Sequence, residues 1–220
     1  MADGNDDGRI KDKLIRSKEE WARQGRLITG RPDMGRVNRL TPGQHEVKNW
    51  PVLDLGIQPD VPKAEWRLTI DGLVANPVTW DLAAFMAQPQ VEEVSDIHCV
   101  TSWSRYDNRW AGVSSRHILD VVKPLPEAAH LIFHSYDGYT TNVTLPAFAD
   151  ANVLLAHSWE GSPLTREHGG PVRVIMPDWY FWKSAKWLKR IEVSNADRPG
   201  FWEVRGYHNE GDPWKEDRYS

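Results

Sequence analysis

The stretch HCVTSWS at residues 98–104 contains the chain's single cysteine, Cys99, and follows a strand-like run at residues 91–97. Residues that bind ligands often lie in the loops between regular elements, and we expect residues 99–110 to form such a loop. One cysteine excludes internal disulfides, dithiol redox motifs and zinc sites built from several thiolates. The interpretation of the chain therefore depends on what Cys99 can do.

Three roles are open to Cys99 at this point. A lone cysteine can pack in the core as a small hydrophobic residue. It can act as a nucleophile beside a histidine, but His98 is a poor partner because neighbouring side chains of an extended strand point to opposite faces. It can also bind a soft metal if another molecule, such as an organic dithiolene, supplies the remaining soft ligands.

Two further stretches combine cationic and hydroxyl side chains. HGGPVR at residues 168–173 places His168 and Arg173 around two glycines, which allow close backbone approach, and arginine binds phosphate in a bidentate fork. A structural turn is the alternative. In WKSAKW at residues 182–187, Ser184 and Lys186 would share one face if extended and could bind one anion. The alternative there is a solvated basic edge strand.

Composition excludes several classes of protein. The 220 residues are 40% hydrophobic, which suffices for a core, and the net charge of −4 argues against a nucleic-acid partner. No apolar run approaches the roughly 20 residues that cross a bilayer, so we expect no membrane insertion. The first 21 residues show no export signal, which predicts a cytoplasmic protein.

Periodicity predicts a mixed, strand-rich α+β fold. Alternation at residues 66–71 indicates a half-buried strand, and Asp81 is a candidate N-cap for a helix that Pro89 stops. A second helix is expected to be capped by Ser114 or Ser115 and to end at Val122. Further strands are predicted at residues 91–100, 131–133, 140–145, 153–156, 172–176 and 187–193. We divide the chain into an arm (1–45, with one helix over 9–26), a main domain (46–196) and an aromatic-rich tail packed on it (197–220).

Tryptophan is unusually common, with 12 of the 23 aromatic residues. Its ring combines a large apolar area with an N–H donor. This preference favours stacking surfaces or a deep pocket. Trp103, Trp110 and Trp182 could line such a pocket, and a core role for each is the alternative.

In their order and spacing, HCVTSWS, HGGPVR and KSAKW resemble the sulfite oxidase family of molybdopterin-dependent oxidoreductases over residues 47–193. The chain looks most like the small cytoplasmic bacterial members. It is more distantly similar to the protein-methionine-sulfoxide reductase catalytic subunits. The resemblance implies a sulfite oxidase-type molybdopterin-binding domain, with molybdenum and molybdopterin as cofactors.

The resemblance also implies a set of site residues. Cys99 would be the thiolate ligand to molybdenum, with the pterin dithiolene supplying the other soft ligands. Its cofactor-binding residues would be Asn49, Ser135, His168, Arg173, Ser184, Ala185 and Lys186.

Departures from the family pattern bear on the substrate. Sulfite oxidases resemble this chain but carry an arginine at the position of Lys48 and a tyrosine at that of Thr141. Lys48 would be the catalytic group beside the substrate, and an ammonium does not reproduce a guanidinium fork. We therefore expect two-electron oxygen-atom transfer that reduces a small-molecule sulfoxide or N-oxide rather than oxidising the oxyanion sulfite.

No C-x-x-C-H haem motif is present, so we expect a separate electron-transfer partner. The alternatives to this function are a sulfite dehydrogenase and a non-catalytic molybdenum-cofactor-binding protein. A tryptophan-rich ligand-binding module without metal is a third possibility.

Overall fold

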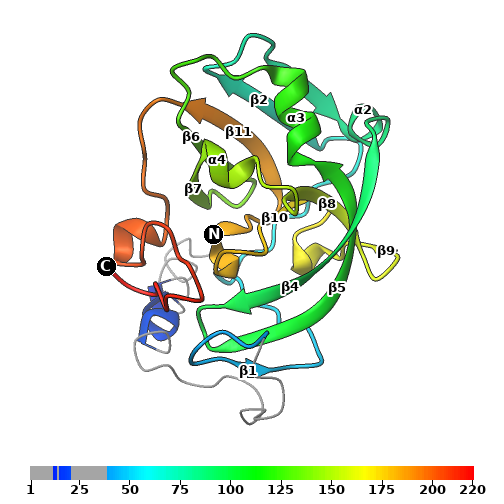
Figure 1. The fold of residues 1–220 in the computed structure, drawn as a ribbon. Helices are drawn as coiled ribbons and strands as arrows, with labels where there is room; N and C mark the ends of the chain where they lie inside the picture. Colours follow the sequence, from blue (N-terminus) through cyan, green and yellow to red (C-terminus); the bar gives the residue numbers. More distant parts are fainter. Residues whose placement is uncertain (1–11, 14, 21–38) are drawn as a thin grey trace, which may run out of the picture.

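The computed structural model describes residues 12–13, 15–20 and 39–220 (Figure 1). In this part of the chain the strands form one sheet of six and one of five. Short helices lie at the sheet edges and connections. The prediction of a mixed, strand-rich α+β fold is confirmed.

A long antiparallel hairpin dominates the first sheet. Its strands β4 and β5 pair from Gln90↔Val113 to Cys99↔Trp103, so Cys99 is the last residue before the turn. On its other side β5 pairs with β8 and, in parallel, with the short β1. The strands of this sheet are β1 (His45–Glu46), β4 (Gln90–Cys99), β5 (Trp103–Ser114), β8 (Leu154–Trp159), β9 (Ser162–Pro163) and β10 (Arg173–Ile175).

The loop predicted at residues 99–110 is wrong, because β5 begins at Trp103 and only residues 100–102 form the turn. Ser102 closes the turn by donating its N–H to the carbonyl of Cys99 at 3.0 Å, and it adopts a φ of 72°. This is the left-handed residue that a three-residue hairpin turn requires. Along β5, buried Tyr106 and Trp110 alternate with exposed charged residues. A strand with one solvated face therefore looked like a polar loop.

The second sheet is mixed, with the strand order β3-β2-β11-β6-β7. Strands β2 and β11 run parallel, and the other neighbours run antiparallel. The strands predicted near residues 66–71, 131–133, 140–145 and 187–193 all lie in this sheet. Their bounds are β2 (Arg67–Gly72), β3 (Val78–Asp81), β6 (His130–Ser135), β7 (Thr140–Thr144) and β11 (Leu188–Ser194).

Capping residues begin both predicted helices. Asp81 accepts a hydrogen bond from the Ala84 N–H at the start of α2 (Leu82–Met86), and Ser114 caps α3 (Ser115–Val122) in the same way. The structure adds α4 (Leu145–Phe148) and three short 3₁₀ helices, η1 (Arg166–His168), η2 (Phe181–Lys183) and η3 (Glu203–Arg205). Within the described ranges, no helix has both the length and the apolar character needed to cross a membrane.

Two hydrophobic clusters fill the interior. The first packs Trp66, Phe85 and Phe133 together with the inner faces of both sheets. The second joins parts of the chain that are far apart in sequence: Ile15, Trp50, Cys99, Trp103, Tyr180, Trp182, Trp202 and Tyr207. The C-terminal stretch thus buries two of its aromatic side chains here. The helix expected over residues 9–26 is helical at 12–13 and 15–20, and its other residues lie outside the described part.

Candidate functional site

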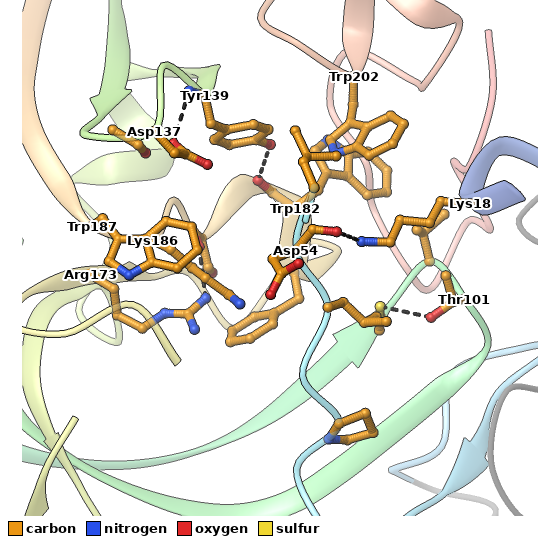
Figure 2. Close-up of a pocket in the computed structure, with 18 of the residues that line it drawn as sticks. Lys18, Asp54, Thr101, Asp137, Tyr139, Arg173, Trp182, Lys186, Trp187 and Trp202 are labelled. Carbon is orange, nitrogen blue, oxygen red and sulfur yellow. Dashed lines mark hydrogen bonds between the residues drawn. The ribbon is translucent and has the colours of Figure 1, made fainter. Parts of the chain in front are cut away.

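A pocket opens within the second cluster, where five distant segments and the N-terminal helix meet (Figure 2). Its empty space is about 830 Å³, including the solvent at its mouth. Most of its wall is apolar or aromatic. The lining residues are Lys18, Trp50, Pro51, Leu53, Asp54, Leu55, Cys99, Val100, Thr101, Trp103, Ser135, Asp137, Tyr139, Arg173, Phe181, Trp182, Ser184, Lys186, Trp187, Trp202 and Tyr207.

Cys99 marks one end of this pocket. Its Sγ is buried and lies 3.1 Å from Thr101 Oγ1. Burial raises the pKa of the thiol, while the Thr101 hydrogen bonds and the charges of Lys18 and Arg218 oppose that shift. The neighbouring His98 lies on the opposite face of β4, where its Nδ1 is 2.9 Å from Ser104 Oγ, and burial lowers its pKa to about 4. His98 therefore does not serve as a base for Cys99.

The other end of the pocket carries Arg173, at the first residue of β10. Its guanidinium is buried and donates to the carbonyls of His168 at 2.9 Å and Ser184 at 2.8 Å. It also lies 4.3 Å from the Phe181 ring centre. Among the described residues, no carboxylate lies within ion-pair distance of this cation. Burial lowers the pKa of Arg173 to about 9, which reflects a charge that lacks a compensating anion.

Ser184 and Lys186 line the same end, in the connection between η2 and β11. The edge-strand alternative is wrong, since no strand includes these residues. Ser184 Oγ accepts from the Met176 N–H at 3.0 Å, and Lys186 Nζ donates to the Glu167 carbonyl at 2.7 Å. Burial, together with the charge of Arg173, lowers the pKa of Lys186 to about 7. Ala185 between them is buried and pairs with the backbone of Val174, outside the pocket lining.

The two glycines after His168 allow the backbone to pack closely against Lys186 and Leu164. Gly169 has a φ of 100°, and a Cβ atom there would lie 2.9 Å from Lys186 Cβ. His168 itself stands behind the pocket wall, with its ring centre 3.9 Å from that of Trp50 and its Nδ1 2.9 Å from Thr165 Oγ1. Burial lowers the pKa of His168. Its side chain supports Trp50, and its carbonyl holds Arg173.

Of the remaining candidates from the sequence, the structure places one in the pocket lining and the others outside it. Ser135 lines the pocket, and its buried Oγ has no hydrogen-bond partner in the described part of the chain. Lys48 and Asn49 are exposed and do not line the pocket, because the chain turns Val47 and Trp50 inward and leaves these polar side chains in solvent. Thr141 is also outside the lining and donates to Glu203 Oε1 at 2.7 Å.

Sequence reasoning missed Lys18, Asp54 and Tyr139. Tyr139, two residues before Thr141, gives the pocket a phenol whose hydroxyl donates to the Trp182 carbonyl at 2.6 Å. Residues two apart in an extended segment share a face, so this position could have been considered. Lys18 lies in the arm, where only its spacing of three residues from Ile15 on the predicted helix gave a signal.

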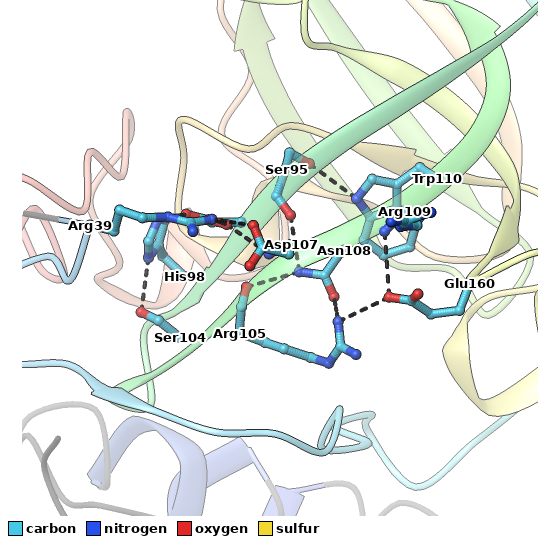
Figure 3. A network of polar contacts seen from close by, with 11 residues as sticks. Arg39, Ser95, His98, Ser104, Arg105, Asp107, Asn108, Arg109, Trp110 and Glu160 are labelled. Atoms are coloured by element: carbon cyan, nitrogen blue, oxygen red, sulfur yellow. Dashed lines mark hydrogen bonds and ion pairs between the residues drawn. The ribbon is translucent and has the colours of Figure 1, made fainter. Parts of the chain in front are cut away.

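A polar network supports the hairpin that carries Cys99 (Figure 3). The buried Asn108 side chain donates to the carbonyls of Ser95 at 3.1 Å and Arg105 at 2.8 Å, close to the register shift between Ser95 and Ile97. Trp110 Nε1 donates to Ser95 Oγ at 3.1 Å. These bonds fix β4 against β5 despite the irregular pairing, and so fix the position of Cys99.

Comparison with known proteins identifies the family. Residues 55–202 match the family model "Oxidoreductase molybdopterin binding domain". The chain is 44% identical over 186 residues to "Uncharacterized oxidoreductase YuiH" of Bacillus subtilis (strain 168), which covers 83% of this chain and 92% of that protein. It is 30% identical to "Putative protein-methionine-sulfoxide reductase subunit YedZ1" of Azospira oryzae, over 68% of this chain and 56% of that one.

A solved structure shows the same fold. The sulfane dehydrogenase SoxCD from Paracoccus pantotrophus superposes with a TM-score of 0.58 and 20% identity, over 63% of this chain and 40% of that chain. The sequence-derived expectations of family, enzyme class and cofactor are thereby confirmed. The chain belongs to the oxidoreductase molybdopterin binding domain family and is a molybdopterin-dependent oxidoreductase of the sulfite oxidase type.

Proposed function

We propose that this enzyme catalyses two-electron oxygen-atom transfer and reduces an organic sulfoxide or N-oxide. The observation that carries this proposal is the largely aromatic wall of the pocket, to which residues such as Trp103, Trp182 and Trp202 contribute. Apolar surface binds the organic groups of such an oxide favourably. Sulfite has no organic group and requires matched positive charge instead. The Azospira oryzae relative, which is named as a protein-methionine-sulfoxide reductase subunit, supports the same substrate class.

The donor groups of the pocket fit a molybdenum cofactor. Arg173 is a buried cation without a carboxylate partner among the described residues. In the same part of the chain, the buried Ser135 hydroxyl has no hydrogen-bond partner. Both features suit an anionic phosphate. At the other end, the Cys99 thiol suits a soft metal. Cys99 would therefore bind molybdenum, while Arg173, Lys186, Ser184 and Ser135 would hold the phosphate of the pterin.

When bound, the cofactor supplies the two-electron redox chemistry and the centre at which oxygen is exchanged. The chain supplies position and electrostatics. Cys99 must lose its proton to become a ligand, since thiolate is the binding form. The charges of Lys18 and Arg218 favour that thiolate against the effect of burial. The tryptophans of the lining give the pocket apolar walls.

A separate electron carrier would supply the electrons. The sequence contains one cysteine and therefore no C-x-x-C-H motif for a covalently bound haem. This supports a separate electron-transfer partner.

Sulfite oxidation is the second candidate, because Tyr139 and Lys18 give the pocket a phenol and a cation that the sequence alone did not reveal. Paired steady-state assays separate the two. Holoenzyme with reduced viologen is tested on dimethyl sulfoxide, methionine sulfoxide and trimethylamine N-oxide, and with ferricyanide on sulfite. We expect higher kcat/KM for at least one oxide. Sulfite turnover far above that of every oxide would overturn the reductase assignment.

Cys99→Ser is the control for the role of the thiol. It should abolish turnover while part of the pterin remains bound, because the phosphate-binding residues are unchanged. Pterin fluorescence after release and molybdenum analysis measure the two parts of the cofactor. Full activity in this variant would contradict thiolate ligation.

A further inference from the structure

The N-terminal helix is fixed over the pocket by contacts on two sides. Ile15 is buried in the cluster that contains Trp50, Cys99 and Trp103. At the next turn the Tyr219 hydroxyl donates to the Glu19 carbonyl at 2.7 Å. Because residues three apart lie on one face of a helix, the burial of Ile15 directs Lys18 toward the same interior. Lys18 accordingly lines the pocket.

The ammonium of Lys18 retains donor capacity. Its Nζ donates to the backbone carbonyl of Asp54. The Asp54 carboxylate is already engaged, accepting from the Gly56 N–H at 2.8 Å and from Gln58 Nε2 at 2.7 Å. Within the described residues no carboxylate oxygen forms a close ion pair with Lys18. An ammonium has three N–H donors, so donors remain for a molecule in the pocket.

Lys18 lies at the thiol end and not at the phosphate end. In Figure 2, Lys18 and Thr101 lie on one side of the pocket, whereas Arg173 and Lys186 lie on the other. Cys99 lines the same pocket, and Ile15, one turn before Lys18, packs in the hydrophobic cluster that contains Cys99. A phosphate bound by Arg173 and Lys186 would leave Lys18 as a cation available to the substrate.

We propose that Lys18, supplied by the N-terminal helix, is a substrate-binding residue whose ammonium donates a hydrogen bond to the oxygen of the oxo-substrate beside Cys99. This inference rests on the proposed oxygen-atom transfer, but it applies to either direction of reaction, since an S-oxide, an N-oxide and sulfite all present an oxygen acceptor. It assigns to Lys18 the part that the sequence had suggested for the exposed Lys48.

The test compares Lys18→Met with Lys13→Met, a matched control on an exposed position of the same helix. Molybdenum per chain, KM and kcat for the best oxide, and the Kd of dimethyl sulfone are measured in the holoprotein. The sulfone presents similar oxygens but is not used as an oxidant, and pocket tryptophan fluorescence reports its binding. Loss of a charged hydrogen bond should raise KM and Kd about tenfold or more. The molybdenum content and the Lys13→Met values should match those of the wild type.

Further variants keep the outcome decisive. Lys18→Arg should recover most of the affinity, and Lys18→Gln provides a second uncharged variant if Lys18→Met folds poorly. Unchanged KM and Kd at full molybdenum content would overturn the inference. So would a loss of molybdenum with unchanged KM in the loaded fraction, which would assign Lys18 to the cofactor. If the wild type oxidises sulfite and reduces no oxide, the reductase proposal fails, and the KM for sulfite in Lys18→Met then tests Lys18 independently.

Discussion

At the scale of single residues, Arg173 is the side chain whose position is hardest to explain by folding alone. A buried charge costs several kcal/mol unless a counter-charge or a set of hydrogen bonds compensates for it. Arg173 has carbonyl acceptors at His168 and Ser184 but no carboxylate partner in the described part of the chain. Under the proposed function, this cation is held in place for the phosphate of the pterin. We therefore expect the cofactor-free protein to respond to small anions.

We expect inorganic phosphate to raise the Tm of the cofactor-free protein through Arg173. A ligand that binds only the folded state stabilises it by about 2.7 kcal/mol at 100 times its Kd. Arg173→Met should lose this response, whereas Arg190→Met should keep it, because Arg190 pairs with Asp71 on the second sheet. Differential scanning fluorimetry across a phosphate series measures the effect. An equal phosphate response in Arg173→Met would place the anion elsewhere.

Lys186 predicts how stability depends on pH. Burial and the charge of Arg173 lower its pKa from the ordinary 10.5 to about 7 in the folded protein. Between these values the unfolded chain binds a proton that the folded chain does not, so the free energy of unfolding rises with pH. For the cofactor-free protein we expect a rise of up to about 1 kcal/mol per pH unit between pH 7 and 9.

Urea unfolding at several pH values checks this expectation. Lys186→Met should flatten the rise, because the titrating group is gone. The control is Lys189→Met, a substitution at an exposed position on β11. If Lys186→Met and the wild type show the same slope, another group causes it.

At the scale of elements, the turn after η1 sets the distance between the HGGPVR stretch and Lys186. Gly169→Ala would place a methyl group 2.9 Å from Lys186 Cβ, at a φ of 100°. Gly206→Ala has a comparable φ of 94° but meets no atom within 4 Å. Both should lose about 1–2 kcal/mol from left-handed strain. Only Gly169→Ala should also lower pterin occupancy, which is measured by the fluorescence of the released pterin. Equal occupancy in both variants would show that the close packing of residue 169 against Lys186 does not affect cofactor binding.

The elements also show what local sequence determines. The helices beginning after Asp81 and Ser114 were predicted because capping residues and apolar spacing are local signals, and both caps form the expected hydrogen bonds. The β5 strand was missed because its alternate charged residues face solvent, so that its sequence resembles a loop. The two-residue strands β1 and β9 contain too few residues for any periodicity.

At the scale of the whole molecule, the pocket combines residues that sequence motifs identify with residues that only the three-dimensional fold brings there. Cys99, Ser135, Arg173, Ser184 and Lys186 were named from motifs, and all five line it. Lys18, Asp54 and Tyr139 belong to none of these motifs, and they reach the pocket through contacts between distant segments. The C-terminal stretch reaches it in the same way, by placing Trp202 and Tyr207 in the wall. A buried ion pair holds that stretch in place.

The pair is Lys183 and Glu203, whose charged atoms lie 2.6 Å apart, both side chains being buried. Glu203 Oε1 also accepts from Thr141 Oγ1 at 2.7 Å and from Trp182 Nε1 at 3.0 Å, so it links η3 to the pocket wall. Glu203→Gln leaves the ammonium uncompensated and should cost about 3–5 kcal/mol. Adding Lys183→Met removes that stranded charge, and the double variant should therefore be more stable than Glu203→Gln alone. Urea unfolding of the wild type, the two single variants and the double variant measures the coupling free energy between the two side chains. Strictly additive losses of stability would mean that the pair does not hold the C-terminal stretch against the pocket.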